Sequence, residues 1–134
     1  MNFIIECLAI GDLADGENHP PVDAILNLSE FRYQTPLIYK HVYFPDFEYL
    51  KDLFLIGQCT EFIHAHIRQR HRVLVHCFAG ISRSAMICTA YLYECGMSFA
   101  EALAFVRQKH PSANPHEALI RSLHDWYAIS GAKS

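Results

Sequence analysis

The sequence predicts an α/β fold in which a central sheet is covered by helices on both faces. Three observations point to it. Short apolar segments occupy the early part of the chain, another such segment runs directly into a helical stretch near residue 77, and helical patterns fill the remainder. The chain has 134 residues, of which 51% are hydrophobic, which is enough for one domain with a substantial core.

The early segments are short and apolar, and turn-forming residues separate them. Gly11 and Asp12 turn the chain after the second segment, and Pro45 stops the fourth. Residues 15–21 contain one glycine and two prolines, which break any regular element, so we predict a loop there. The segments predicted as strands are residues 3–5, 8–10, 24–28 and 40–44.

From about residue 50 the apolar residues recur at helical spacing. A further strand at residues 71–75 interrupts this pattern before the second predicted helix, and Ser98 with Glu101 forms a capping box for the third. The last helix is predicted to open with Asn114 as its cap and Pro115 in its first helical position. The predicted helices cover residues 50–70, 84–94, 99–109 and a final stretch after residue 114.

Composition excludes several classes of protein. The net charge is −3 with no run of Lys or Arg, so we expect neither nucleic-acid binding nor attachment to a membrane surface. No apolar run approaches the length of a membrane span, and the N-terminus lacks the basic region of a signal peptide. Five cysteines without C-x-x-C spacing favour a reducing compartment, so we expect a cytoplasmic protein. The nine histidines include no i, i+4 pair, and no metal site is predicted.

Cys77 and Arg83 lie six positions apart in residues 75–84, which read VHCFAGISRS. A loop between a strand and a helix can direct successive backbone N–H groups at one point, to which the helix adds its positive end, and the result is an anion cradle. Such a cradle favours the thiolate form of a cysteine at its centre. Arg83 adds a planar fork of donors that fits a phosphate, Gly80 lets the backbone approach closely, and Ser84 offers a hydroxyl to the thiolate.

This stretch resembles the signature H-C-x5-R-[ST] of the cysteine-dependent protein phosphatases, and the match from His76 to Ser84 is full, Gly80 included. The resemblance covers nearly the whole chain and is closest to the compact dual-specificity type, although residues 9–14 and 24–28 match only loosely. It implies a mostly parallel sheet with the loop at the carboxyl end of a strand. It also implies hydrolysis of phosphotyrosine, with phosphoserine and phosphothreonine, through a cysteinyl-phosphate intermediate and without a cofactor.

The resemblance assigns roles to several residues. His76 is expected to point away from the site and to hydrogen-bond the loop from behind, while Asn114 resembles the asparagine that opens the family's last helix and braces the loop. A simple N-cap explains Asn114 equally well. The loop residues expected to hold the phosphate oxygens are Phe78, Ala79, Gly80, Ile81, Ser82 and Arg83.

The proposed chemistry also needs an acid that protonates the leaving oxygen and later deprotonates water. Asp46 fits best, because it follows a strand and Pro45 and lies 31 positions before Cys77, a separation similar to that in the dual-specificity phosphatases. The alternatives are that Asp46 only caps the following helix, or that Glu48 is the acid.

Other residues carry weaker hypotheses. One hypothesis is that Cys88 or Cys95 traps an oxidised Cys77 as a disulfide. Because both lie in an apolar helix, a packing role is favoured instead. Tyr33, Tyr39 and Tyr43 are candidates for a surface that selects substrates. The simpler interpretation is that they are aromatic residues at the edge of strands.

The variable loop positions carry no basic residue, which argues against phosphoinositide and RNA 5′-triphosphate substrates and for a phosphorylated protein or peptide. Two functions from other classes remain as alternatives. One is a rhodanese-like sulfurtransferase, which also holds a cysteine in an anion-binding loop, and the other is a phospho-binding module without turnover. The physiological substrate and the oligomeric state are not predicted.

Overall fold

The computed structural model describes residues 1–131 of the chain. Its five-stranded sheet has the order β1-β2-β5-β3-β4, in which β1 pairs antiparallel with β2 and all other pairs are parallel. The prediction of a mostly parallel sheet is therefore confirmed. The strands are β1 (Asn2–Ile5), β2 (Leu8–Gly11), β3 (Ala24–Asn27), β4 (Ile38–His41) and β5 (Val73–His76).

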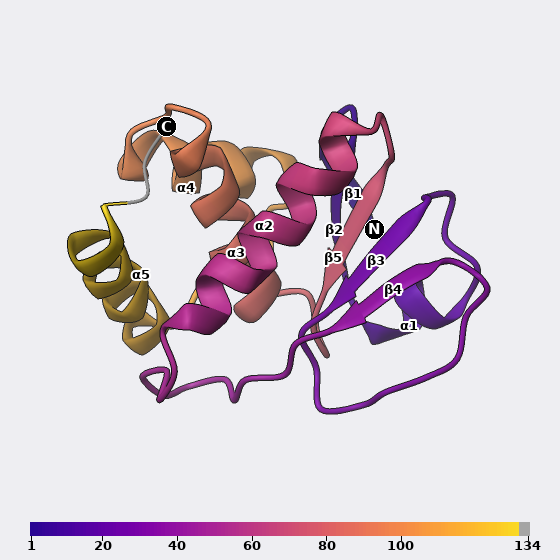
Figure 1. Ribbon diagram of the computed structural model, residues 1–134, viewed down its shortest axis with the longest axis horizontal. Coiled ribbons are helices and arrows are strands. Elements are labelled where there is room, and N and C mark those ends of the chain that lie inside the picture. The colour runs from indigo at the N-terminus through magenta and orange to yellow at the C-terminus, as the bar shows by residue number, and fades with distance from the viewer. Residues whose placement is uncertain (132–134) are drawn as a thin grey trace.

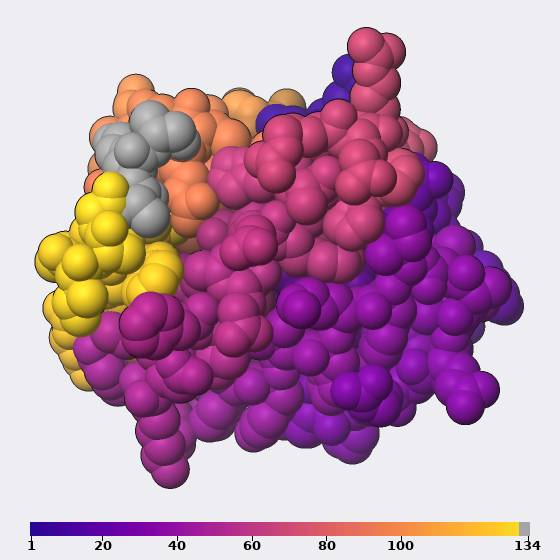
Figure 2. All heavy atoms as spheres, in the orientation of Figure 1, coloured from indigo at the N-terminus to yellow at the C-terminus, as the bar shows by residue number. Residues whose placement is uncertain are grey.

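Most of the helices lie on one side of this sheet, where α2 crosses in front of α3 and α5 flanks them (Figure 1). In the space-filling view α2 and the yellow α5 form a continuous packed surface on this side (Figure 2). The short α1 lies on the opposite side of the sheet (Figure 1), where it packs against β5 and β3. The helices are α1 (Leu13–Glu17), α2 (Phe54–Arg68), α3 (Arg83–Glu94), α4 (Phe99–Lys109) and α5 (Glu117–Ser130).

Alternation along the central strands divides the core into two clusters. Leu8, Leu26 and Val75 face the large helical side and are fully buried in the main cluster. Ile25 and Leu74 point the other way into a smaller cluster, which the chain between β3 and β4 helps to cover. Because both faces are buried, these strands consist almost wholly of apolar residues.

The register of the three central strands determines where a site can form. His76 at the end of β5 pairs with Gly11 of β2 on one side and with Asn27 of β3 on the other. The carboxyl ends of three parallel strands therefore meet at one edge of the sheet, and the loops that follow them converge there.

Two of the predicted elements are wrong in part. Residues 15–21 are not wholly a loop, because Asp12 and Asp15 form a capping box that starts α1 in spite of the nearby glycine. The strand predicted at residues 40–44 lies instead at Ile38–His41. Val42 and Phe44 are buried, but they reach the core after the strand has ended. Their apolar character therefore reflects core packing and not strand pairing.

Candidate active site

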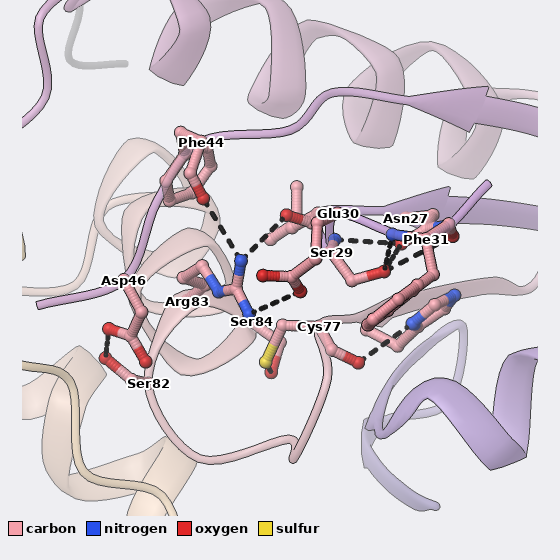
Figure 3. Close-up of polar contacts among 12 residues, drawn as sticks. Asn27, Ser29, Glu30, Phe31, Phe44, Asp46, Cys77, Ser82, Arg83 and Ser84 are labelled. Carbon is pink, nitrogen blue, oxygen red and sulfur yellow. Dashed lines mark hydrogen bonds and ion pairs between the residues drawn. The ribbon is translucent and has the colours of Figure 1, made fainter.

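The loop from Cys77 to Ser82 connects β5 to α3 at the carboxyl edge of the sheet (Figure 3). Its carbonyl groups are held from outside: Leu13 N–H donates to the Phe78 oxygen at 3.0 Å and Asn114 N–H to the Ile81 oxygen at 2.7 Å. At Gly80 the φ angle is +71°, and an added Cβ would lie 2.8 Å from the Gly11 oxygen. The loop needs a glycine here because a side chain has neither the room nor the backbone conformation.

The backbone N–H groups of this loop are left without protein partners. Among the described residues, none of the six from Phe78 to Arg83 donates a hydrogen bond to another protein group. Gly80, Ser82 and Arg83 are buried, and buried backbone donors are almost always paired. Six consecutive unpaired donors beside a helix N-terminus form a cradle suited to the oxygens of an oxyanion.

Cys77 lies at the base of the cradle and is only 3% exposed. Its Sγ lies 3.2 Å from Oγ of Ser84, which is fully buried in the first turn of α3 (Figure 3). When the sulfur carries a negative charge, the Ser84 hydroxyl is the donor of this hydrogen bond. The predicted contact between Cys77 and the Ser84 hydroxyl is therefore present in the structure.

Arg83 is buried and its guanidinium is positioned by the chain around it. Nη1 donates to the Phe44 carbonyl oxygen at 3.2 Å, and Nη2 lies 3.4 Å from a Glu30 carboxylate oxygen (Figure 3). Its Nε is buried without a hydrogen-bond partner. A buried arginine N–H without a partner is a donor available to an oxyanion in this loop.

Glu30 enters the site on a turn built by β3. The buried Asn27 side chain donates to the Phe31 carbonyl oxygen at 2.7 Å and accepts from the Ser29 N–H at 2.8 Å, which fixes the chain on both sides of Glu30 (Figure 3). Hydrogen bonding to its own backbone and the neighbouring Arg83 guanidinium hold the pKa of Glu30 below its ordinary value. Glu30 therefore stays ionised at neutral pH and orients the arginine.

His76 supports the loop from behind, as the sequence predicted. It is fully buried; its Nδ1 lies 3.1 Å from the Cys77 carbonyl oxygen and its Nε2 lies 2.7 Å from the Tyr33 hydroxyl. Burial lowers the pKa of His76 below its ordinary value, so the ring is neutral. The geometry assigns the proton to Nδ1, which donates to the carbonyl, while Nε2 accepts from Tyr33.

Asp46 lies against the opposite wall of the loop. Its Oδ1 accepts a hydrogen bond from the Ser82 hydroxyl at 2.7 Å (Figure 3). The same oxygen accepts from the Phe47 N–H at 2.8 Å. The Ser82 hydroxyl in turn accepts from the His116 N–H at 2.9 Å. This chain of contacts links the predicted acid, the cradle and the start of α5, and it uses only one of the two carboxylate oxygens.

For the phosphatase activity that the sequence resemblance implies, Ser82→Ala is expected to lower kcat on a phosphotyrosine peptide roughly 10-fold, the effect of losing one hydrogen bond to a charged group. The reason is that the Asp46 carboxylate loses the donor that holds it beside the cradle. Steady-state kinetics with two leaving groups provide the test. The decrease should be smaller for p-nitrophenyl phosphate, whose leaving group needs little protonation. An equal decrease for both substrates would assign Ser82 a purely structural role.

Cys77 and Asp46 open onto one hollow of about 670 Å³. The loop residues Phe78, Ala79, Ile81, Ser82 and Arg83 line it too, whereas Glu48 does not. The hollow also contains side chains that sequence reasoning missed: Glu30, Phe31, Phe47 and His116. The sequence does contain an indication for Glu30 and Phe31, because they follow a predicted strand whose carboxyl end lies at the same edge of the sheet as the loop.

The expectation that Asn114 caps the last helix is wrong. The cap is His116, whose Nδ1 accepts from the Ala118 N–H at 3.1 Å, and α5 begins only at Glu117. Asn114 does brace the loop, but through its backbone N–H, while its side chain accepts from Arg107 at 3.2 Å. Pro115, which was expected at the first helical position, instead lies directly before the cap.

Several other candidates lie apart from the hollow. Cys88 is fully buried within α3, where burial raises the pKa of its thiol above the usual range, and Cys95 is exposed at the end of the same helix. Tyr33 and Tyr39 pack behind the loop, and only Tyr43 of that trio lines the hollow. In the described part of the chain, no group of three or more His, Cys, Asp or Glu side chains is arranged to hold a metal ion.

Comparison with known proteins assigns this architecture to a family. The family model described as dual specificity phosphatase, catalytic domain, matches residues 17–129. The chain is 43% identical over 89 residues to dual specificity protein phosphatase 1 of Arabidopsis thaliana, covering 66% of this chain but only 45% of that protein. It is 33% identical to a protein of Invertebrate iridescent virus 6 that is provisionally named a tyrosine phosphatase, covering 90% and 87% of the two chains.

Solved structures share the fold at lower sequence identity. The crystal structure of human DUSP28 has a TM-score of 0.85 and 24% identity, covering 100% of both chains. The structure of human tyrosine phosphatase-like serine/threonine/tyrosine-interacting protein has a TM-score of 0.87 and 24% identity, covering 98% of both chains. These two likenesses establish the fold and agree with the α/β architecture described above.

Proposed function

This chain belongs to the dual specificity phosphatase family, and from that premise we propose that it hydrolyses phosphotyrosine, and also phosphoserine and phosphothreonine, in proteins through a cysteinyl-phosphate intermediate. The observation that carries the proposal is the set of unpaired donors around Cys77. Six successive backbone N–H groups, from Phe78 to Arg83, and Arg83 Nε have no protein acceptor among the described residues. An oxyanion with several oxygens, such as a phosphate monoester, supplies the missing acceptors.

In the first step the Cys77 thiolate attacks phosphorus, the S–P bond forms and the bond from phosphorus to the leaving oxygen breaks. Asp46 donates its proton to that oxygen, so the product leaves as a neutral alcohol or phenol. The Oδ2 atom of Asp46 is suited to carry this proton, because the hydrogen bonds from Ser82 and Phe47 both go to Oδ1.

In the second step water attacks the thiophosphate, Asp46 accepts a proton from the water, and the S–P bond breaks to release inorganic phosphate. Ser84 donates to the departing sulfur, from which its hydroxyl lies 3.2 Å away. Through both steps Arg83 and the loop N–H groups hold the equatorial oxygens, and donors fixed in this way stabilise the transition state most strongly.

The setting of the enzyme is part of the proposal. We treat residues 1–134 as one phosphatase domain that works in the reducing cytoplasm, where a reactive thiol stays available. All five cysteines are free thiols in the structure, which supports a reducing compartment. None of the helices in residues 1–131 has the length and apolar character needed to cross a membrane.

Wild-type protein is expected to release inorganic phosphate from phosphotyrosine and phosphothreonine peptides in buffer containing a chelator and a thiol reductant. The same preparation should transfer no sulfur from thiosulfate to cyanide, the reaction of the rhodanese-like alternative. Folded protein that binds the peptides tightly but releases no phosphate would contradict the proposal and favour a phospho-binding module. Sulfur transfer without phosphate release would favour the sulfurtransferase.

A further inference from the structure

An unusual concentration of exposed aromatic and apolar side chains surrounds the hollow. Five of the ten exposed large hydrophobic residues in the described chain line this one opening; they are Phe31, Tyr43, Phe47, Phe78 and Ile81. An exposed apolar patch that gathers in one place marks a surface for binding. We propose that this rim selects phosphotyrosine flanked by apolar residues over phosphoserine and over acidic segments. The inference rests on the proposed phosphatase function and specifies its substrate.

The rings form two pairs contributed by four different segments of the chain. Phe31, from the turn after β3, and Phe78, from the cradle, have ring centroids 5.9 Å apart. Phe47, next to Asp46, meets His116 at the start of α5 edge-to-face at 5.5 Å. All four residues line the same hollow as Cys77. An aromatic substrate entering the hollow therefore meets aromatic walls, with which its own ring can pack in offset or edge-to-face geometry.

The backbone at Phe47 has a strained conformation. Its φ angle is +65°, a left-handed conformation that is uncommon for a bulky residue, and its side chain is 73% exposed. A backbone conformation of this kind persists where the surrounding structure imposes it, often at a functional site. Here Asp46 accepts the Phe47 N–H at 2.8 Å, so the position of the ring and that of the proposed acid are set together.

Cys77 is buried whereas the rim is exposed, and this difference favours a substrate whose phosphate is carried on a long, rigid side chain. Cys77 is 3% exposed, whereas Phe47 and Phe78 are 73% and 55% exposed. The phosphorus of phosphotyrosine lies a full ring further from the peptide backbone than that of phosphoserine. A tyrosyl phosphate can therefore reach the sulfur while the peptide stays at the rim, and its ring then fills the space between the aromatic walls.

The charges of the opening disfavour acidic neighbours of the phosphorylated residue. Among the described residues, Arg83 is the only Lys or Arg side chain that lines the hollow; it is buried and already pairs with Glu30. The acidic lining groups are the carboxyl groups of Glu30 and Asp46, and the titratable rings there are those of Tyr43 and His116. Within residues 1–131, the lining of the hollow therefore offers no exposed Lys or Arg to a second phosphate or to a glutamate beside the scissile one.

Four phosphopeptides test the proposal: phosphotyrosine or phosphoserine, each flanked by leucines or by glutamates. Wild-type kcat/KM should be highest for the phosphotyrosine peptide with leucines, by at least about 10-fold over its phosphoserine counterpart. Phe47→Ala should lower kcat/KM for that best peptide about 3- to 10-fold, the effect of losing one aromatic contact. The phosphoserine peptides should change less than twofold, and Phe47→Tyr, which keeps a ring, should retain the preference.

Two further variants make the test specific. Phe47→Gly accepts the positive φ without strain and should lose the preference to the same extent as Phe47→Ala. Ile129→Ala removes an apolar side chain that is 71% exposed on α5, away from the hollow, and should leave the ranking unchanged. Equal wild-type turnover of all four peptides, or equal losses for both phosphoamino acids in Phe47→Ala, would overturn the specificity while leaving the phosphatase function intact. No turnover of any peptide would overturn both.

Discussion

Cys77→Ser is expected to reduce phosphate release by at least about 10³-fold, because the serine hydroxyl is a far weaker nucleophile than a thiolate. The change swaps one atom in a buried side chain, and the serine can still hydrogen-bond Ser84. The fold should therefore survive, and the cradle with its unpaired donors and Arg83 should still bind phosphate esters. Steady-state hydrolysis of a phosphotyrosine peptide, beside binding of the same peptide by calorimetry, separates the two effects.

The control for this variant is Cys95→Ser, which changes an exposed cysteine at the end of α3 and should retain full activity. If Cys77→Ser kept substantial turnover, the sulfur would not be the nucleophile. If it lost peptide binding together with activity, the cradle would depend on Cys77 for its shape, and the loss of turnover would say little about the chemistry.

Asp46→Asn is expected to lower kcat by about 10² to 10⁴-fold for a phosphothreonine peptide, the usual contribution of a general acid. The loss should be clearly smaller for p-nitrophenyl phosphate, because p-nitrophenolate leaves readily without a proton. The amide oxygen of asparagine can still accept hydrogen bonds from Ser82 and Phe47, so the segment should keep its place against the cradle. Kinetics with both substrates show whether proton donation, rather than position, has been removed.

Glu48→Gln is the matched control, since Glu48 is two positions away, exposed and outside the hollow. It should leave both substrates within about twofold of wild type, as expected for a surface change without a specific contact. A large loss in Glu48→Gln with little effect of Asp46→Asn would exchange the roles of the two carboxylates.

The features that depend on local sequence were predictable. A strand that runs through His76 into a glycine-containing loop and an apolar helix specifies its own geometry, and the structure shows Cys77 and Ser84 in contact as expected. The capping box of Ser98 and Glu101 is present for the same reason, because both partners lie within one helical turn. Asp46 was placed by its position after a strand, and it does line the same hollow as Cys77.

The features that depend on contacts between distant segments were not predictable. Glu30 pairs with Arg83 across 53 positions, and only the parallel register of β3 and β5 brings them together. Asn114 is predicted to be the cap because asparagine is a good capping residue, but its backbone N–H bonds Ile81 of the loop, and His116 caps the helix instead. The two ring pairs that line the hollow, Phe31–Phe78 and Phe47–His116, come from four segments, and no pattern within any one segment indicates a shared surface.

The proposed mechanism requires Cys77 to carry the phosphoryl group during turnover. Rapid acid quenching of wild-type protein with excess phosphotyrosine peptide, followed by peptide mapping by mass spectrometry, tests it most directly. We expect a phosphorylated peptide that contains Cys77, formed within the first turnover and absent from Cys77→Ser. Steady release of phosphate without any phosphorylated enzyme, or phosphate found on another residue, would contradict the mechanism.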